Sequence, residues 1–186
     1  MDEPIMISVI IPTYNRCQLL KECLESLGRQ TYPLSDIEVM VVNDGSTDGT
    51  EAFLEDFKTR APFQFRYFRQ QNKGPAAARN LALQNAKGNL IAFTDDDCTV
   101  DPDWLKEFAK GFQEKRIAGY GGAVRPKEDH LIGEYMTRER SLEPKEIERC
   151  DLFAHRPPGR SGRTMSKFAY CGFSSHRVKS SQFTSE

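Results

Sequence analysis

The chain has 186 residues, of which 38% are hydrophobic and 28% are charged. This length suits one domain with a substantial core, and the composition is that of a soluble globular protein rather than a disordered one. No window approaches the roughly 20 apolar residues of a membrane helix, and the acidic start MDEPIM lacks the basic region of a signal peptide. We therefore expect a cytoplasmic protein without a transmembrane segment.

The formal net charge is only −1, but the charge is unevenly distributed. Residues 1–150 carry 20 basic and 25 acidic side chains, whereas residues 151–186 carry 6 basic and 2 acidic ones. The five cysteines include no CxxC pair, so neither a disulfide framework nor a zinc site is indicated. We expect a main domain over residues 1–150, with its motifs within residues 5–125, and a disordered or loosely packed basic tail over 151–186.

Apolar runs rich in β-branched residues alternate with stretches of helical periodicity. In chain order, the pattern predicts a strand at 7–11 ended by Pro12, a helix at 15–30 capped by Asn15, a strand at 37–42, a helix capped by Ser46 or Thr47, a strand at 65–68, a helix from Gly74 to Gly88, a strand at 90–94, a helix at 102–112, a strand at 117–124 and a charged helix at 134–150. This alternation predicts an α/β fold in which helices flank a largely parallel sheet.

Polar clusters follow three of the expected strands at their carboxyl ends: PTYNR, NDGS and TDDD. Ligands of open α/β sheets bind in the crevice at these ends. The three consecutive carboxylates Asp95, Asp96 and Asp97 could form a solvated loop, as most charge runs do. Their place at a strand end favours a Mg²⁺ or Mn²⁺ site instead, with the ion carrying phosphate groups.

The segment NDGSTDGT is open to three interpretations, of which the simplest is a strand-to-helix turn. The string from Asp44 to Glu55 also fits the spacing of an EF-hand calcium loop, but a β-branched strand precedes it where an EF-hand has a helix. In the third interpretation, Asp44 accepts a hydrogen bond from a nucleobase, and Gly45 lets the backbone approach closely.

The segment KGPAAARN suits a helix start, with Arg79 about one turn inside the helix. Arg79 could reach a diphosphate, or it could form a structural ion pair with one of the three aspartates. Both interpretations place it in the same crevice. Tyr14 and Asn15 could contact a ligand or only cap the helix that follows them.

Four motifs, VIIPTYNR, VVNDGSTDGT, GPAAARN and FTDDDC, occur in an order and spacing that resemble family 2 nucleotide-sugar glycosyltransferases. The resemblance covers about residues 5–125. It implies the Rossmann-like GT-A fold, a nucleotide-diphospho-sugar donor that is usually UDP-linked, and transfer of the sugar with inversion. A divalent ion would neutralise the departing diphosphate, and a general base would deprotonate the acceptor hydroxyl.

The resemblance also assigns roles to residues. Pro12, Thr13 and Asp44 would hold the base, Arg79 would lie along the nucleotide, and Asp97 would bind the ion. The expected nucleotide-sugar-binding residues are Pro12, Thr13, Tyr14, Asn15, Asp44, Gly45, Arg79, Asp95 and Asp96, and the expected metal ligands are Asp97 and Asp95.

Two departures from the family pattern limit these expectations. Asn43 stands where the family usually has an aspartate, and no acceptor-side half is recognisable after Val124. The carboxylates that follow, Glu128, Asp129, Glu134 and Asp151, lack the context of a catalytic base. We therefore assign no catalytic residue and keep two hypotheses, a transferase and a truncated or non-catalytic module that only binds the donor. A nucleotidyltransferase ranks last, because PTYNRCQ lacks the glycine-rich loop of that class.

The acceptor is not specified by the sequence and could be a polysaccharide or other glycan, a lipid or a protein. We expect no nucleic-acid partner. The basic tail would allow peripheral association with anionic lipid on the cytoplasmic face of a membrane.

Overall fold

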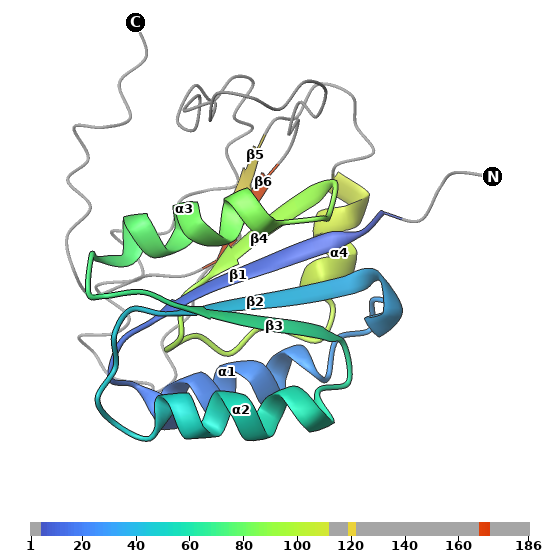
Figure 1. Cartoon of the computed structure of the whole chain (residues 1–186). Helices are drawn as coiled ribbons and strands as arrows, with labels where there is room; N and C mark the ends of the chain where they lie inside the picture. The colour runs from blue at the N-terminus through green and yellow to red at the C-terminus, as the bar shows by residue number, and fades with distance from the viewer. Residues whose placement is uncertain (1–4, 112–118, 122–167, 172–186) are drawn as a thin grey trace, which may run out of the picture.

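The computed structural model describes residues 5–111, 119–121 and 168–171. The strands are β1 (Ile7–Thr13), β2 (Ile37–Asn43), β3 (Gln64–Arg69), β4 (Leu90–Thr94), β5 (Gly119–Gly121) and β6 (Phe168–Cys171), and the helices are α1 (Cys17–Leu27), the 3-10 turn η1 (Leu34–Asp36), α2 (Thr50–Arg60), α3 (Pro75–Asn85) and α4 (Trp104–Gly111). These strands form one sheet in the order β3-β2-β1-β4-β6-β5, and every neighbouring pair is parallel (Figure 1). The predicted α/β fold with a parallel sheet is confirmed.

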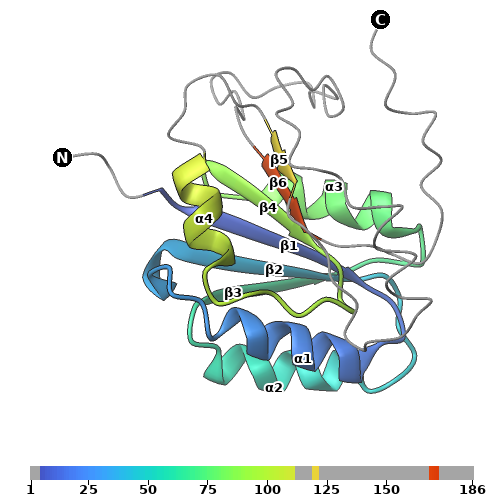
Figure 2. The same ribbon diagram turned by 180° about the vertical axis from the view of Figure 1, so that it is seen from behind.

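Helices cover both faces of the sheet. Helices α1, α2 and α4 lie on one face and α3 lies on the other (Figures 1 and 2). Val9 and Ile11 of β1 belong to the larger apolar cluster with α1, α2 and α4, whereas Ile10 packs with Ala78 and Ala82 of α3. Because both faces are covered, β1 and β2 are buried along their whole length, which is typical of central strands in parallel sheets.

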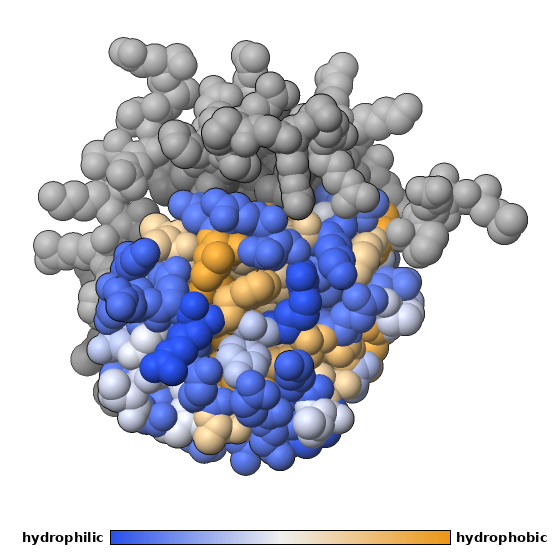
Figure 3. All heavy atoms as spheres, in the orientation of Figure 1, coloured by the Kyte–Doolittle hydropathy of each residue, from blue (hydrophilic) through white to orange (hydrophobic). Residues whose placement is uncertain are grey.

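The α3 side of the molecule keeps some apolar surface. Figure 3 shows it in the middle of this face, flanked by hydrophilic side chains. Phe68, on the edge strand β3, is only partly buried, and the guanidinium of Arg66 lies 5.7 Å from the centre of its ring. The edge strand is therefore less buried than the strands that deliver the polar clusters.

Strand β1 continues two residues past its predicted end, through Pro12 to Thr13. A proline inside a central strand normally removes a ladder hydrogen bond. Here the pairing of β1 with β4 stops at Ile10, while its pairing with β2 continues to Thr13. Pro12 therefore lies where only one neighbouring strand remains, and β1 carries Thr13 to the carboxyl edge of the sheet.

Helices α1 and α2 begin later than predicted because they share one cap. Asn15 does not cap α1; it adopts φ 53°, and the N-cap position is Arg16. Asp48 supplies the missing acceptors, since one carboxylate oxygen accepts from the N–H of Cys17 (3.1 Å) and the other from the N–H of Thr50 (3.0 Å). Burial alone would raise the pKa of Asp48, but the hydrogen bonds from the hydroxyl of Thr50 and from these backbone N–H groups outweigh it and lower the pKa.

Helix α3 starts at Pro75, directly after Gly74, as the sequence predicts. Gly74 has φ 87°, a value that favours glycine. The helix ends at Asn85, before the predicted end at Gly88, because Gly88 is engaged elsewhere. Its N–H donates to Ser8 Oγ over 2.8 Å.

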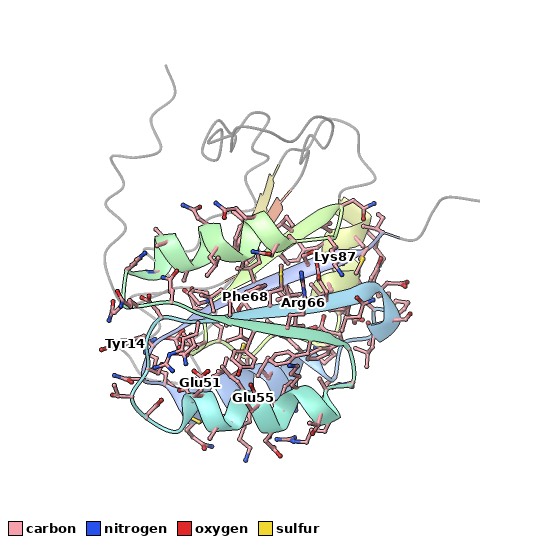
Figure 4. All side chains as sticks on the ribbon, viewed as in Figure 1. Tyr14, Glu51, Glu55, Arg66, Phe68 and Lys87 are labelled. Atoms are coloured by element: carbon pink, nitrogen blue, oxygen red, sulfur yellow. The ribbon has the colours of Figure 1, made fainter. Side chains whose placement is uncertain are left out.

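A buried carboxylate organises the amino ends of the strands. Glu38 is 1% exposed and accepts hydrogen bonds from Ser8 Oγ (2.5 Å), the N–H of Lys87 (2.5 Å) and the guanidinium of Arg66 (2.9 Å). Figure 4 shows Arg66 and Lys87 on the opposite half of the sheet from Tyr14. This network therefore belongs to the scaffold rather than to the carboxyl edge.

The tail that was expected to be disordered or loosely packed contributes β6, which lies between β4 and β5. The prediction is wrong for these four residues, and the remainder of 151–186 lies outside the described residues, as does the predicted helix at 134–150. Strand β5 falls within the predicted strand at 117–124. Within the described part of the chain, no helix has both the length and the apolar composition to cross a membrane.

Candidate functional site

Thr13 joins the three predicted polar clusters by hydrogen bonds at the carboxyl edge of the sheet. The backbone N–H of Asp44, after β2, donates to the carbonyl of Thr13 at the end of β1 over 2.9 Å. The hydroxyl of Thr13 in turn donates to Asp96, after β4, over 2.7 Å. Residues 83 positions apart in the chain, Thr13 and Asp96, therefore meet at one site, as expected for parallel strands.

Asp44 is 4% exposed and holds the loop that leads into α3. One carboxylate oxygen accepts from Gln70 Nε2 (2.7 Å) and the N–H of Lys73 (2.9 Å), and the other accepts from the N–H of Gly74 (2.8 Å). The oxygen that accepts from Gly74 keeps a second lone pair, which is still an acceptor for a ligand N–H. Asp44 is thus fixed in orientation at the position where a base acceptor was predicted.

Beside Asp44 lies a hollow of about 510 Å³, lined by Gly45, Arg69, Gln70, Gln71 and Asn72. Gly45 has φ 82°, and a Cβ atom there would lie 3.1 Å from the backbone nitrogen of Asn72. A side chain at this position would therefore be strained by both conformation and space. Glycine is therefore required here by the chain's own backbone, and the close approach of Gly45 to a nucleobase stays a prediction.

Arg79 forms the ion pair that was one of its two predicted roles. Its guanidinium lies 2.5 Å from Asp95 Oδ1, and the two side chains are 20% and 5% exposed. The pair joins α3 to the segment after β4, so Arg79 lies beside the three aspartates. The ion pair and a contact with a bound diphosphate are compatible, because a guanidinium has five N–H donors.

Arg16 is the second arginine of the site and was not among the residues predicted from the sequence. Its Nη1 atom lies 2.8 Å from Asp97 Oδ2 and 3.2 Å from Asp96 Oδ1, so one nitrogen bridges two carboxylates. Burial disfavours the charge on Arg16, but Asp96 and Asp97 outweigh it and raise the pKa of the guanidinium. Burial raises the pKa of Asp96, although the hydroxyl of Thr13 and the charge of Arg16 oppose that shift.

Asp97 is the carboxylate best placed to hold a divalent ion. Its side chain is 25% exposed, whereas those of Asp95 and Asp96 are 5% and 6% exposed. No group of three or more His, Cys, Asp or Glu among the described residues could hold a metal ion alone. Because Mg²⁺ is usually bound through one or two carboxylates together with substrate phosphates, Asp97 fits as a single protein ligand. Asp95 is engaged by Arg79, and its role as a second ligand stays a prediction.

The EF-hand interpretation of NDGSTDGT is wrong. The side chains that would converge on calcium have different partners: Asp44 binds the loop before α3, Ser46 Oγ accepts from the N–H of Asn15 (2.9 Å), and Asp48 caps α1 and α2. Asn43, the departure from the family pattern, has a role in the turn, since its Oδ1 accepts from the N–H of Ser46 over 2.8 Å.

The remaining predicted residues lie at the same edge. Pro12 is buried in β1, and Tyr14 is 45% exposed beyond the end of that strand, at the left of the view in Figure 4. The side-chain oxygen of Asn15 accepts from the N–H of Thr47 (2.8 Å), which ties the first loop to the second. Tyr14 is therefore free to face a ligand, whereas Asn15 is engaged in holding the two loops together.

Solved glycosyltransferases share this architecture. The structure is similar to that of Staphylococcus aureus TarS in complex with UDP-GlcNAc, with a TM-score of 0.61 and 31% identity over 68% of this chain and 37% of that chain. It is also similar to the mannosyltransferase PcManGT from Pyrobaculum calidifontis in complex with GDP-Man and Mn²⁺, with a TM-score of 0.62 and 30% identity over 68% of this chain and 37% of that chain. The fold is therefore that of the GT-A glycosyltransferases.

The family model of glycosyl transferase family 2 matches residues 8–170, and the chain belongs to this family. The match extends beyond residue 125, the limit of the resemblance expected from the sequence motifs. Among curated relatives, Glycosyltransferase AglE from Haloferax volcanii is 38% identical over 118 residues, which is 63% of this chain and 39% of AglE. The chain thus spans less than two fifths of the length of each of these three relatives.

Proposed function

We propose that this chain binds a nucleotide-diphospho-sugar, UDP-linked, at the carboxyl edge of its sheet and transfers the sugar with inversion to an acceptor hydroxyl. The observation that carries the proposal is the chain of hydrogen bonds from Asp44 through Thr13 to Asp96, flanked by two arginines. The UDP-GlcNAc in the TarS complex supports the choice of uridine, and the family membership supports the reaction.

In this proposal, the base occupies the hollow beside Gly45 and meets Pro12, Thr13 and Asp44. A carboxylate is the fitting partner for the N–H of a uracil ring, because it only accepts hydrogen bonds when ionised. Tyr14, exposed at the end of β1, contacts the nucleoside. The buried carboxylate of Asp95 or Asp96 meets the ribose hydroxyls.

The diphosphate lies between the arginines and Asp97. Arg79 binds a phosphate oxygen with an N–H that it does not give to Asp95, because guanidinium and phosphate pair strongly. Asp97 holds the Mg²⁺ or Mn²⁺ ion, which stabilises the departing diphosphate when bound. The PcManGT complex with Mn²⁺ supports a divalent ion for this family fold.

Thermal unfolding tests the donor proposal. Ligand at about 100 times its Kd adds about 2.7 kcal/mol of stability, which corresponds to roughly 5–10 °C for a chain of this size. We expect this shift with UDP and Mn²⁺ together and a smaller one with GDP and Mn²⁺. Asp97→Asn should reduce the shift, whereas the matched control Asp56→Asn, on the exposed surface of α2, should not. A larger shift with GDP would refute uridine, and no shift with any nucleotide would refute the donor site.

Product analysis separates transfer from binding alone. A transferase incubated with a UDP-sugar, Mn²⁺ and a panel of glycan, lipid and peptide acceptors should form a glycosylated product of inverted anomeric configuration. Slow release of UDP without any glycosylated product would instead favour the donor-binding module. Fractionation of cells would test the cytoplasmic location that we propose with this function.

A further inference from the structure

We propose that Arg16 is a displaceable counter-ion that occupies the place of the divalent cation until the donor arrives, and that it then moves to the donor's diphosphate. This inference rests on the proposed function, because it needs a diphosphate donor and an ion on Asp97. It adds a positioning residue that sets how strongly the site binds metal without donor.

The charge of the site supports this exchange. Three carboxylates, Asp95, Asp96 and Asp97, are matched by two guanidinium groups, and Arg79 pairs with Asp95. Arg16 alone bridges the other two carboxylates, at 3.2 and 2.8 Å. That half of the site carries one unmatched negative charge, which is too little to favour a divalent cation while Arg16 stays. A bound ion and Arg16 next to each other would repel, so the ion must displace the guanidinium from Asp97.

The contacts of Arg16 differ from those of Arg66, an arginine that is built into the scaffold. Arg66 pairs with Glu38, whose side chain is 2% exposed, and also donates to the carbonyl of Asn85 over 2.5 Å. The side-chain hydrogen bonds of Arg16 among the described residues end instead on Asp96 and on the candidate metal ligand Asp97, whose side chain is 25% exposed. Among the described residues, the guanidinium of Arg16 is thus held only by the carboxylates of Asp96 and Asp97, and no backbone carbonyl accepts a hydrogen bond from it.

The position of Arg16 allows its side chain to move. It stands at the N-cap of α1, and its side chain, which is 32% exposed, makes no capping hydrogen bond. Moving the side chain therefore leaves the helix start intact, because Asp48 supplies the cap. A diphosphate brought by the ion lies within the same cluster, and guanidinium binds phosphate oxygens in a bidentate manner. The guanidinium of Arg16 would exchange the carboxylate of Asp97 for a phosphate group of the donor, so it would keep an anionic partner.

The test compares the full chain with Arg16→Gln and the matched control Arg29→Gln, which alters an exposed arginine beyond the end of α1. Binding of Mn²⁺ alone is followed by the paramagnetic resonance signal of the free ion, and binding of UDP is followed by calorimetry in saturating Mn²⁺. We expect Arg16→Gln to bind Mn²⁺ alone about tenfold more tightly, because a nearby positive charge is gone, and to bind UDP about tenfold more weakly, because a charged hydrogen bond is lost. Arg29→Gln should change neither affinity.

The opposite signs distinguish this role from a structural one, which would weaken both affinities together. If Arg16→Gln binds Mn²⁺ alone as tightly as the unaltered chain or more weakly, the proposal that Arg16 is a counter-ion is overturned. Tighter Mn²⁺ binding with unchanged UDP affinity overturns the move to the diphosphate. If the unaltered chain binds no nucleotide, the proposed function fails, but the comparison of Mn²⁺ affinities still decides whether Arg16 is a counter-ion.

A second measurement on the unaltered chain does not depend on the variant folding. Phenylglyoxal modifies accessible arginines, and mass spectrometry reports the extent at each position. We expect Mn²⁺ alone to increase the modification of Arg16 and UDP with Mn²⁺ to reduce it again, while Arg29 stays constant. Unchanged modification of Arg16 on addition of saturating Mn²⁺ would overturn the displacement.

Discussion

Replacing Gly88 with alanine should destabilise the fold without touching the candidate site. A Cβ atom at this position would lie 2.6 Å from Ser8 Oγ, 2.7 Å from the carbonyl oxygen of Met6 and 2.7 Å from the nitrogen of Ser8. Two of these atoms belong to the backbone of β1 or the residue before it, which cannot move without its neighbours. The methyl group must therefore push the chain before β4 away from β1.

The structure gives the size of the effect. Overpacking a buried position costs about 1–3 kcal/mol. The shift also strains the hydrogen bonds from the N–H of Gly88 to Ser8 Oγ (2.8 Å) and from the N–H of Leu90 to the carbonyl of Met6 (3.2 Å), and each such bond contributes about 1 kcal/mol. Alanine also lowers the conformational entropy of the unfolded chain, which offsets about 0.4–1 kcal/mol of this loss of stability. The net loss should be about 2–3 kcal/mol, or roughly 4–12 °C in melting temperature.

Urea unfolding followed by tryptophan fluorescence measures this loss, because Trp104 is the single tryptophan and is 8% exposed in the core. Gly49→Ala is the matched control: Gly49 precedes α2 with φ −69°, and a Cβ atom there meets nothing within 4 Å. Its free energy of unfolding should stay within about 0.5 kcal/mol of the unaltered chain. A Gly88→Ala variant as stable as Gly49→Ala would refute the close approach before β4.

Three further predictions address the carboxyl edge. Thr13→Val removes a donor to buried Asp96 and should lower the free energy of unfolding by about 1–2 kcal/mol in urea; an unchanged value would contradict that hydrogen bond. The lowered pKa of Asp48 means that its charge stabilises the fold above the unfolded pKa near 3.9 and that this contribution is lost as pH falls through the lower folded pKa. Asp48→Asn should therefore cost about 1 kcal/mol at pH 7 and less at pH 3 in thermal melts, and an equal loss at both pH values would refute the assignment. Arg79→Met removes the cation beside Asp95 and should cost about 3–5 kcal/mol, part of which the added change Asp95→Asn should restore; no recovery would show that the pair is not coupled.

Elements with a strong local signal could be predicted from the sequence. Strand β4 occupies the predicted residues, because an apolar run ends abruptly in three aspartates. Helix α3 begins where Gly74 and Pro75 predict it, since both residues restrict the backbone locally. The ion pair of Arg79 with Asp95, one of its two predicted roles, followed from its place one turn into that helix.

Features that depend on distant partners could not be predicted in this way. Strand β6 has only four residues, and its pairing with β4 joins segments more than 70 positions apart, so no local periodicity indicates it. Arg16 was overlooked for a related reason: its partners, Asp96 and Asp97, are 80 and 81 residues away. A count of charges would have suggested it, because three adjacent carboxylates at a buried strand end need more than one cation.

The two ends of β1 allow the scaffold and the site to be tested separately. Ser8, which Gly88 touches, and Thr13 lie five residues apart on this strand, or about 16 Å. Effects of sites at this distance that share no partner usually add, so folded Gly88→Ala should bind UDP with a Kd within about twofold of the unaltered chain, despite its larger loss of stability. Thr13→Val should weaken UDP binding at a smaller loss of stability, as calorimetry in Mn²⁺ at low temperature would measure. If Gly88→Ala weakened UDP binding as much as Thr13→Val, β1 would transmit strain along its length, and the carboxyl edge could not be treated as an independent donor site.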